Sequence, residues 1–306
     1  MRNIESYRPE KKVARGKSSR NFSHADKDLD DDERKNFDIK HNPKIIRRAI
    51  IYTLTTVALV SAIVFSAYKI IRWKAESDIT NETIATIQSE TKVTAIENPE
   101  KAIEIKKPDN QRYLDMDLIT VDFTNLKQTN NNTVGWINVP GTSINYPYVQ
   151  TTNNDFYLRH TFDGHWSDAG WVFLDYRNTP NLTGDNQIIY AHGRIDGSMF
   201  GSLQNVLSKE WQDNLDNHVV KIATETNSSL WQVFSVYRIG VTNDYIKTNF
   251  KNETVFLDFI NMIKGRSAYD FKTDVTETDK ILTLSTCIGT NERAVLHAKL
   301  IKTIEK

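Results

Sequence analysis

The chain contains a single cysteine, Cys287, at the end of the strand-like apolar run 281–287. One thiol cannot form a disulfide within its own chain, so Cys287 is interpreted either as a small buried side chain or as a nucleophile. A thiol attacks a carbonyl as the thiolate, and the departing amine must take up a proton. A nearby histidine would serve both steps, and a cationic donor would stabilise the oxyanion that forms between them.

His192 has the sequence context that best suits the acid and base. It ends the strand-like run 187–192 and is followed by Gly193. A histidine at a strand end before a glycine is expected to project its ring from the rim of the sheet. His297 lies inside an alternating strand and is interpreted as a surface or packing residue. Three other histidines lie in loop-like sequence and are expected to be solvated: His160, His165 and His218.

Arg293 is the candidate oxyanion donor. It begins the strand that follows Cys287, and two antiparallel strands joined by a short turn would bring the guanidinium to the thiol. The alternative for Arg293 is a salt bridge with Glu292 or another carboxylate. Ser285 lies two residues before Cys287 and therefore on the same face of the strand. One cysteine and dispersed histidines make no zinc set, so we expect neither a metal nor a cofactor.

Short strand-like segments separated by turns follow Pro108 and predict a mainly β domain over residues 108–306, either a closed barrel or a sandwich. Two helices are expected to interrupt them, at 198–207 and 253–263, the second inside a long connection of the kind that is often functional. The expected strands are 134–139, 143–149, 171–174, 187–192, 219–223, 231–239, 280–287 and 293–301.

The N-terminal part differs in charge from the rest of the chain. Residues 1–74 carry 17 Lys and Arg against 9 Asp and Glu, whereas residues 75–306 carry 22 against 30. Between the halves, Ala49–Tyr68 is uncharged and long enough to cross a bilayer as a helix, so a transmembrane helix is predicted over 49–71. A cleaved signal peptide is the alternative, but the run starts late and lacks a clear cleavage site.

The positive-inside rule places the N-terminus in the cytoplasm and the following domain outside the cell, because 14 basic residues precede the apolar run. Residues 1–48 are expected to form a disordered tail, and their mixed charges favour no nucleic-acid partner. Residues 72–107 are polar and helix-compatible and are interpreted as a stalk or as helices packed on the domain.

The motifs together resemble those of sortases, the membrane-anchored cysteine transpeptidases of Gram-positive bacteria. Thr283-Leu284-Ser285-Thr286-Cys287 with Arg293 is similar to their cysteine and arginine signature, and Tyr190-Ala191-His192-Gly193 to their histidine motif. Class B members are resembled in particular by the helix-bearing insertion before the cysteine strand and by five further segments, 134–137, 140–142, 146–147, 154–158 and 173–176.

The resemblance implies an eight-stranded sortase-type barrel with peripheral helices and a catalytic set of His192, Cys287 and Arg293. It also implies that Asn154, Leu158 and Ser285 line a groove for the substrate. The implied substrates are surface proteins with a C-terminal sorting signal of the Asn-Pro-x-Thr or Leu-Pro-x-Thr-Gly kind. These are cleaved after Thr, held as a thioester, and passed to an amine of a lipid-linked peptidoglycan precursor at the cell membrane.

Three other functions remain open at this point. Within the sortase resemblance, pilin polymerisation is an alternative to wall anchoring, because the amine acceptor is not written in the enzyme's own sequence. The same three residues suit a membrane-tethered cysteine protease that gives its acyl group to water. A non-enzymatic function is the third alternative: a surface binding or adhesion module whose cysteine is structural.

Overall fold

The computed structural model describes residues 43–97, 101–288 and 291–306, with Cys287 and Ile288 described by their backbone alone. The helices are α2 (Pro43–Glu90), α3 (Gln111–Leu114), α4 (Thr124–Thr129), η2 (Phe156–Leu158), η3 (Gly201–Leu207), α5 (Lys209–Asp213), η4 (Leu215–Asn217) and α6 (Glu253–Gly265). The strands are β1 (Val93–Ile96), β2 (Ile103–Glu104), β3 (Leu118–Val121), β4 (Thr133–Asn138), β5 (Asn145–Val149), β6 (Phe173–Leu174), β7 (Asn186–Ala191), β8 (Val219–Ala223), β9 (Asn227–Gly240), β10 (Ile281–Ile288) and β11 (Glu292–Glu305).

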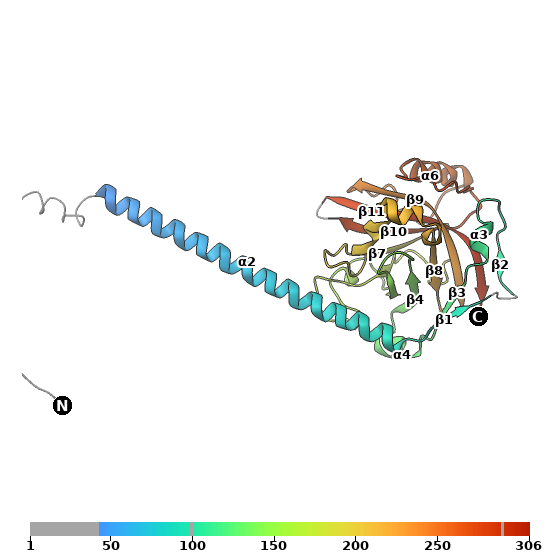
Figure 1. Ribbon diagram of the computed structural model, residues 1–306, viewed down its shortest axis with the longest axis horizontal. Coiled ribbons are helices and arrows are strands. Elements are labelled where there is room, and N and C mark those ends of the chain that lie inside the picture. Colours follow the sequence, from blue (N-terminus) through green and yellow to red (C-terminus); the bar gives the residue numbers. More distant parts are fainter. Residues whose placement is uncertain (1–42, 98–100, 289–290) are drawn as a thin grey trace, which may run out of the picture. The chain divides into compact units, whose positions relative to one another are not determined.

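A closed barrel forms the body of the domain (Figure 1). Within the described residues, eight strands are hydrogen-bonded in the order β10-β7-β6-β5-β4-β8-β9-β11, and β10 pairs with β11 to close the ring. The eight-stranded barrel is therefore confirmed, and the sandwich alternative is wrong. All eight expected strands are present; β2 extends the edge beside β11, and β1 pairs with β3 in a separate small sheet.

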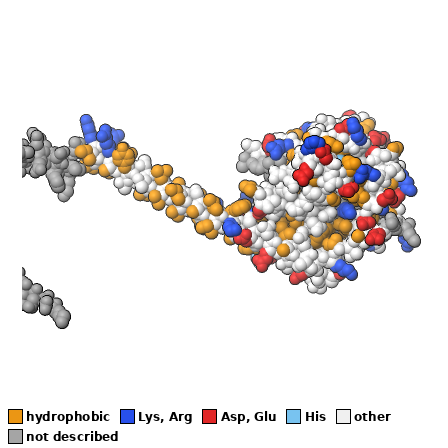
Figure 2. Space-filling view, in the orientation of Figure 1, with side chains coloured by type: hydrophobic (Ala, Val, Ile, Leu, Met, Phe, Trp, Pro, Cys, Tyr) orange, Lys and Arg blue, Asp and Glu red, His pale blue; other side chains and the backbone are white. Residues whose placement is uncertain are grey.

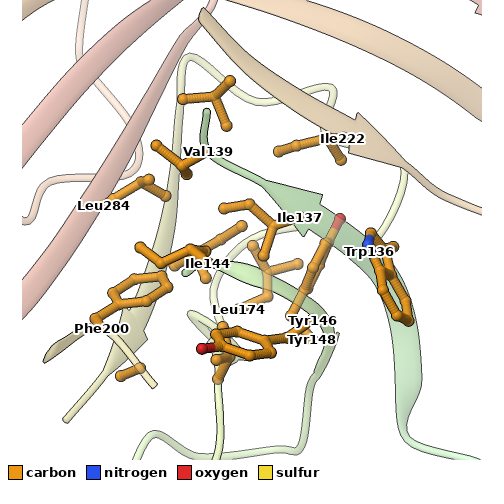
Figure 3. Close-up of a cluster of buried hydrophobic side chains, with 14 of the residues drawn as sticks. Trp136, Ile137, Val139, Ile144, Tyr146, Tyr148, Leu174, Phe200, Ile222 and Leu284 are labelled. Carbon is orange, nitrogen blue, oxygen red and sulfur yellow. The ribbon is translucent and has the colours of Figure 1, made fainter. Parts of the chain in front are cut away.

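The barrel interior is filled by apolar side chains that alternate along the strands (Figure 3). On β10, Leu282 and Leu284 point into this core, whereas Ile281 belongs to a second cluster outside the barrel. Packing leaves no room at Gly135, where an added Cβ would overlap the ring and hydroxyl oxygen of Tyr148. A side chain at this position would have to displace a fully buried ring.

Helix α6 covers the outer face of β9, β10 and β11. Its first turn is capped by the Asn252 side chain, which accepts a hydrogen bond from the Val255 N–H. The helix buries four residues at helical spacing against Phe234 and Tyr237 of β9: Phe256, Phe259, Ile260 and Ile263. The expected helix at 253–263 is present, and its buried face covers the second hydrophobic cluster.

Two histidines, His297 and His218, are buried in the fold. His297 is fully buried beneath the α6 side of the barrel, where it contacts the hydroxyls of Tyr237 and Thr283 at 2.9 Å each, so it is a packing residue. His218, expected to be solvated, is buried, and that expectation is wrong. Its Nε2 donates to the Gln212 carbonyl, because the turn at η4 folds the ring under α5.

Helix α2 runs continuously from Pro43 to Glu90, and the chain divides after Lys69 into two units that are described separately. In the first unit, the helix is long and apolar enough to cross a membrane, and its hydrophobic side chains are exposed along its length (Figure 2). In the second unit, Ser77, Thr80 and Ile87 of the helix are buried. Of the expected tail 1–48, residues 1–42 lie outside the described residues.

Candidate active site

A cleft of about 500 Å³ opens where β7 and β10 end and β11 begins. Its walls include every side chain of the predicted site that the structure describes: His192, Arg293, Asn154, Leu158 and Ser285. These five residues come from four separate segments of the chain, so the barrel closure brings them together. The volume is in the range of pockets that hold small ligands or peptide side chains.

Strand register fixes where Cys287 lies in the backbone. On one side, β10 and β11 are antiparallel and Cys287 is directly opposite Arg293. On the other side, β10 runs parallel to β7, with Thr286 beside Ala191 and the Thr286 hydroxyl donating to the Ala191 carbonyl at 2.9 Å. The next residues along these two strands are Cys287 and His192. The backbone position of the cysteine therefore lies between the histidine and the arginine.

The His192 ring is half-buried and held by one hydrogen bond. Its Nε2 lies 2.7 Å from the Leu158 carbonyl oxygen, which can only accept, so Nε2 carries a proton and donates. In the neutral ring Nδ1 is then the acceptor nitrogen. The backbone is fixed as well, because the His192 carbonyl accepts from the Phe200 N–H at 3.0 Å. The histidine is thus anchored to both the η2 turn and the segment before η3.

The Arg293 guanidinium has most of its donors unused by the parts of the protein that the structure describes. Its Nη1 donates to the Glu292 backbone carbonyl at 3.1 Å, and among the described residues it forms no ion pair with a carboxylate. The Glu292 side chain pairs instead with Arg238 at 3.5 Å. The salt bridge proposed as the alternative for Arg293 is therefore not formed with any described residue. The guanidinium lines the cleft instead.

Asp175 organises the cleft wall, although the sequence analysis gave it no role. This carboxylate is fully buried and accepts from Arg177 through two side-chain nitrogens, from the Tyr190 hydroxyl at 2.9 Å, and from the Asn154 amide at 3.0 Å. Burial alone would raise the pKa of Asp175, but these hydrogen bonds outweigh it and hold the pKa below its usual range. The anion fixes Asn154 and Tyr190, which both line the cleft. The signal that could have found it is the motif 173–176.

Tyr245 is a second residue that the sequence analysis missed. It lies in the connection between β9 and α6, is buried, and its hydroxyl is 2.9 Å from the Ser285 hydroxyl. Both side chains line the cleft. The long insertion therefore contributes directly to the wall, through a contact across 40 residues of sequence.

The sortase domain family model matches residues 137–301. Sortase B of Listeria monocytogenes serovar 1/2a (strain ATCC BAA-679 / EGD-e) is 34% identical over 193 residues, which cover 59% of this chain and 74% of that protein. Sortase B of Staphylococcus aureus (strain NCTC 8325 / PS 47) is 33% identical over 184 residues, covering 59% and 75%.

Solved structures of sortase B also match the chain. The crystal structure of sortase B from B. anthracis in complex with AAEK1 matches with a TM-score of 0.61 and 33% identity, covering 74% of this chain and 99% of that one. The Staphylococcus aureus sortase B–substrate complex matches with a TM-score of 0.55 and 33% identity, covering 59% and 84%.

Proposed function

The chain belongs to the sortase family of cysteine transpeptidases, with relatives of class B, and we propose that it anchors surface proteins to a cell-wall precursor. The substrate is a C-terminal sorting signal of the Asn-Pro-x-Thr or Leu-Pro-x-Thr-Gly kind, cleaved after Thr. The observation that carries this proposal is the register of β10. Cys287 pairs with Arg293 of β11, and the residue before it, Thr286, pairs with Ala191, the residue before His192.

The proposed mechanism has two acyl transfers. The Cys287 thiolate attacks the Thr carbonyl, and Arg293 with a backbone N–H holds the oxyanion. The C–N bond breaks as protonated His192 gives its proton to the departing amine, leaving a thioester. Neutral His192 then removes a proton from the incoming amine, which attacks the thioester, forms the new amide and releases the thiolate.

Recognition of the signal is proposed for Asn154, Leu158 and Ser285. The Asn154 side chain is held at both ends, since its amide donates to Asp175 and its carbonyl oxygen accepts from the Tyr176 N–H at 3.0 Å. One amide hydrogen and one lone pair remain for a ligand. A polar side chain held this firmly loses little entropy on binding.

The full-length chain in detergent micelles allows a direct test. Signal peptides of the two kinds are added with and without an amine, and the protein and peptide products are followed by mass spectrometry. We expect a peptide thioester on the wild-type chain, its loss in Cys287→Ala, and a ligated product when the amine is present. An adduct that survives in Cys287→Ala would refute the nucleophile assignment.

The products also separate the other functions. Release of the free acid at the same rate with amine present would indicate a protease. No adduct with any signal peptide would indicate a binding module. A ligated product formed with a lysine of a second protein, and not with wall-precursor amines, would indicate pilin polymerisation.

The apolar part of α2 is proposed to cross the cell membrane with the N-terminus in the cytoplasm and the barrel outside. Cys287 is the only thiol of the chain, which makes it a topology probe. A membrane-impermeant maleimide should label the chain in intact cells, and Cys287→Ala should not be labelled. Labelling that appears only after lysis would place the barrel on the inner side.

A further inference from the structure

Trp166 stands apart from most tryptophans of the chain by its exposure. Of six tryptophans, four are buried, whereas Trp73 and Trp166 expose 40% and 58% of their surface. An indole with an apolar body and one N–H is suited to a place that is partly apolar and partly wet. Such side chains are enriched where lipid headgroups meet the acyl chains.

Trp166 is presented by a short hairpin, residues 159–167, here called the Trp166 hairpin. Its two arms are joined by backbone hydrogen bonds from Thr161 to His165 at 2.8 Å and from Ser167 to Arg159 at 2.9 Å. The guanidinium of Arg159 lies 5.6 Å from the centre of the Trp166 ring. The hairpin therefore holds an exposed aromatic ring and an exposed cation together on a fixed backbone.

The hairpin is rooted in the barrel. Phe162 at its turn is buried and packs against Trp171 at 5.4 Å between ring centres, and the Asn130 amide donates to the Phe162 carbonyl. The outward ring of Trp166 is therefore not free to fold back into the core, because the turn that carries it is already anchored there.

An ion pair connects Asp168, the residue after this hairpin, to the part of α2 that follows the uncharged run. The Asp168 carboxylate lies 3.8 Å from the Arg72 guanidinium. Arg72 follows Tyr68, the last residue of the uncharged run, by four positions, which is about 6 Å of helix and at most about 14 Å of extended chain. A headgroup layer is about 5–8 Å thick. Arg72 must therefore lie in or just above the headgroups if the run crosses a bilayer.

We propose that the Trp166 hairpin rests on the outer surface of the bilayer, with the Trp166 ring in the headgroup layer. The inference rests on the proposed membrane span of α2. The charge pattern fits a lipid surface, since Arg159 is available to lipid phosphates while Asp168 is paired with Arg72, and Asp163 is engaged by the Thr161 hydroxyl and by His165. Leu158, the residue before the hairpin, lines the cleft together with Asn154, so the contact would hold the cleft rim at the membrane surface.

Tryptophan fluorescence tests the contact in the full-length chain. The protein is inserted into phosphatidylcholine–phosphatidylglycerol vesicles whose acyl chains carry bromine, a contact quencher, close to the headgroup. Trp73→Phe leaves Trp166 as the exposed indole, and Trp166→Phe leaves Trp73, which chain connectivity places at the membrane surface. The double variant reports the four buried rings and supplies the background.

We expect the extent of bromine quenching of Trp166 to agree within about twofold with that of Trp73, since both rings would lie in the same interfacial layer. Quenched Trp73 with unquenched Trp166 overturns the proposal: aqueous acrylamide then reports whether Trp166 faces water or is covered by another protein chain. Failure of both rings to be quenched overturns it too, because α2 would not be inserted. The thioester assay in detergent is independent of these outcomes, so the transpeptidase proposal stands or falls separately.

Discussion

The buried imidazole of His297 gives the folded domain a defined sensitivity to acid. The ring has no exposed surface, and its two nitrogens contact the hydroxyls of Tyr237 and Thr283. Burial, aided by the positive charge of Arg266, lowers the pKa of His297 to about 3. The folded chain therefore keeps this histidine neutral at pH values where an exposed histidine is protonated.

The sign of the effect follows from proton uptake. Below a pH of about 6.5 the unfolded chain binds a proton at this position, whereas the folded chain does not until about pH 3. The free energy of unfolding is unaffected by His297 above about pH 6.5 and falls as the pH drops from there toward 3. At pH 5 the loss is about 2 kcal/mol, from about 1.36 kcal/mol for each of 1.5 pH units. This figure depends on the unfolded pKa alone, as long as the folded pKa lies well below 5.

The assay is urea unfolding of the full-length chain in detergent at pH 7.5 and pH 5, followed by the emission of the buried tryptophans. His297→Gln cannot take up a proton, so its stability should fall about 2 kcal/mol less than that of the wild type between the two pH values. Val295→Ala, at a buried position on the same strand, should lower stability equally at both. Equal pH dependence in wild type and His297→Gln would refute the reasoning.

Three further changes have outcomes set by the structure. Arg293→Lys should lower kcat/KM for signal cleavage about 100-fold, because an ammonium cannot reproduce the fork that holds an oxyanion; Arg238→Lys on the neighbouring strand is the control, and equal rates in both variants would remove Arg293 from the mechanism. Asp175→Asn should raise KM for the signal peptide about tenfold through loss of the anion that holds Asn154, while alkylation of the thiol keeps its rate; an unchanged KM would count against this positioning role. Gly135→Ala should destabilise the domain by about 1–3 kcal/mol in urea unfolding, whereas Gly265→Ala, where nothing lies within 4 Å, should not; similar midpoints for the two would contradict the packing argument.

The strands and the apolar helix were predictable because their signals are local. Alternating apolar residues identify a strand face within a few positions, as in 281–287, and an uncharged run of twenty residues identifies a possible membrane span. Both patterns were found at the expected residues, but their bounds differ: β9, β11 and helix α2 extend beyond the predicted ranges, and β6 is shorter than predicted. Small strands outside the barrel, such as β2 with two residues, carry too short a pattern to be recognised.

The burial of individual histidines was not predictable in the same way. His218 follows a polar turn, and nothing in its neighbours along the chain shows that α5 folds over it. His297 shares an alternating strand face with Lys299, which is typical of an exposed face, yet both are buried beneath other segments. Lys299 is paired there with Asp109, 190 residues earlier in the chain.

The sequence by itself determined which residue types are present for acyl transfer, the order of their motifs, and the strands and helix that carry them. Tertiary structure alone decided that His192 and Arg293 border one cleft, that Asp175 holds Asn154 in its wall, and that Tyr245 reaches Ser285. The physical reason is the range of the interactions. Hydrophobic periodicity acts within one element, whereas the parallel pairing of β7 with β10 joins residues 95 positions apart and depends on closure of the whole barrel.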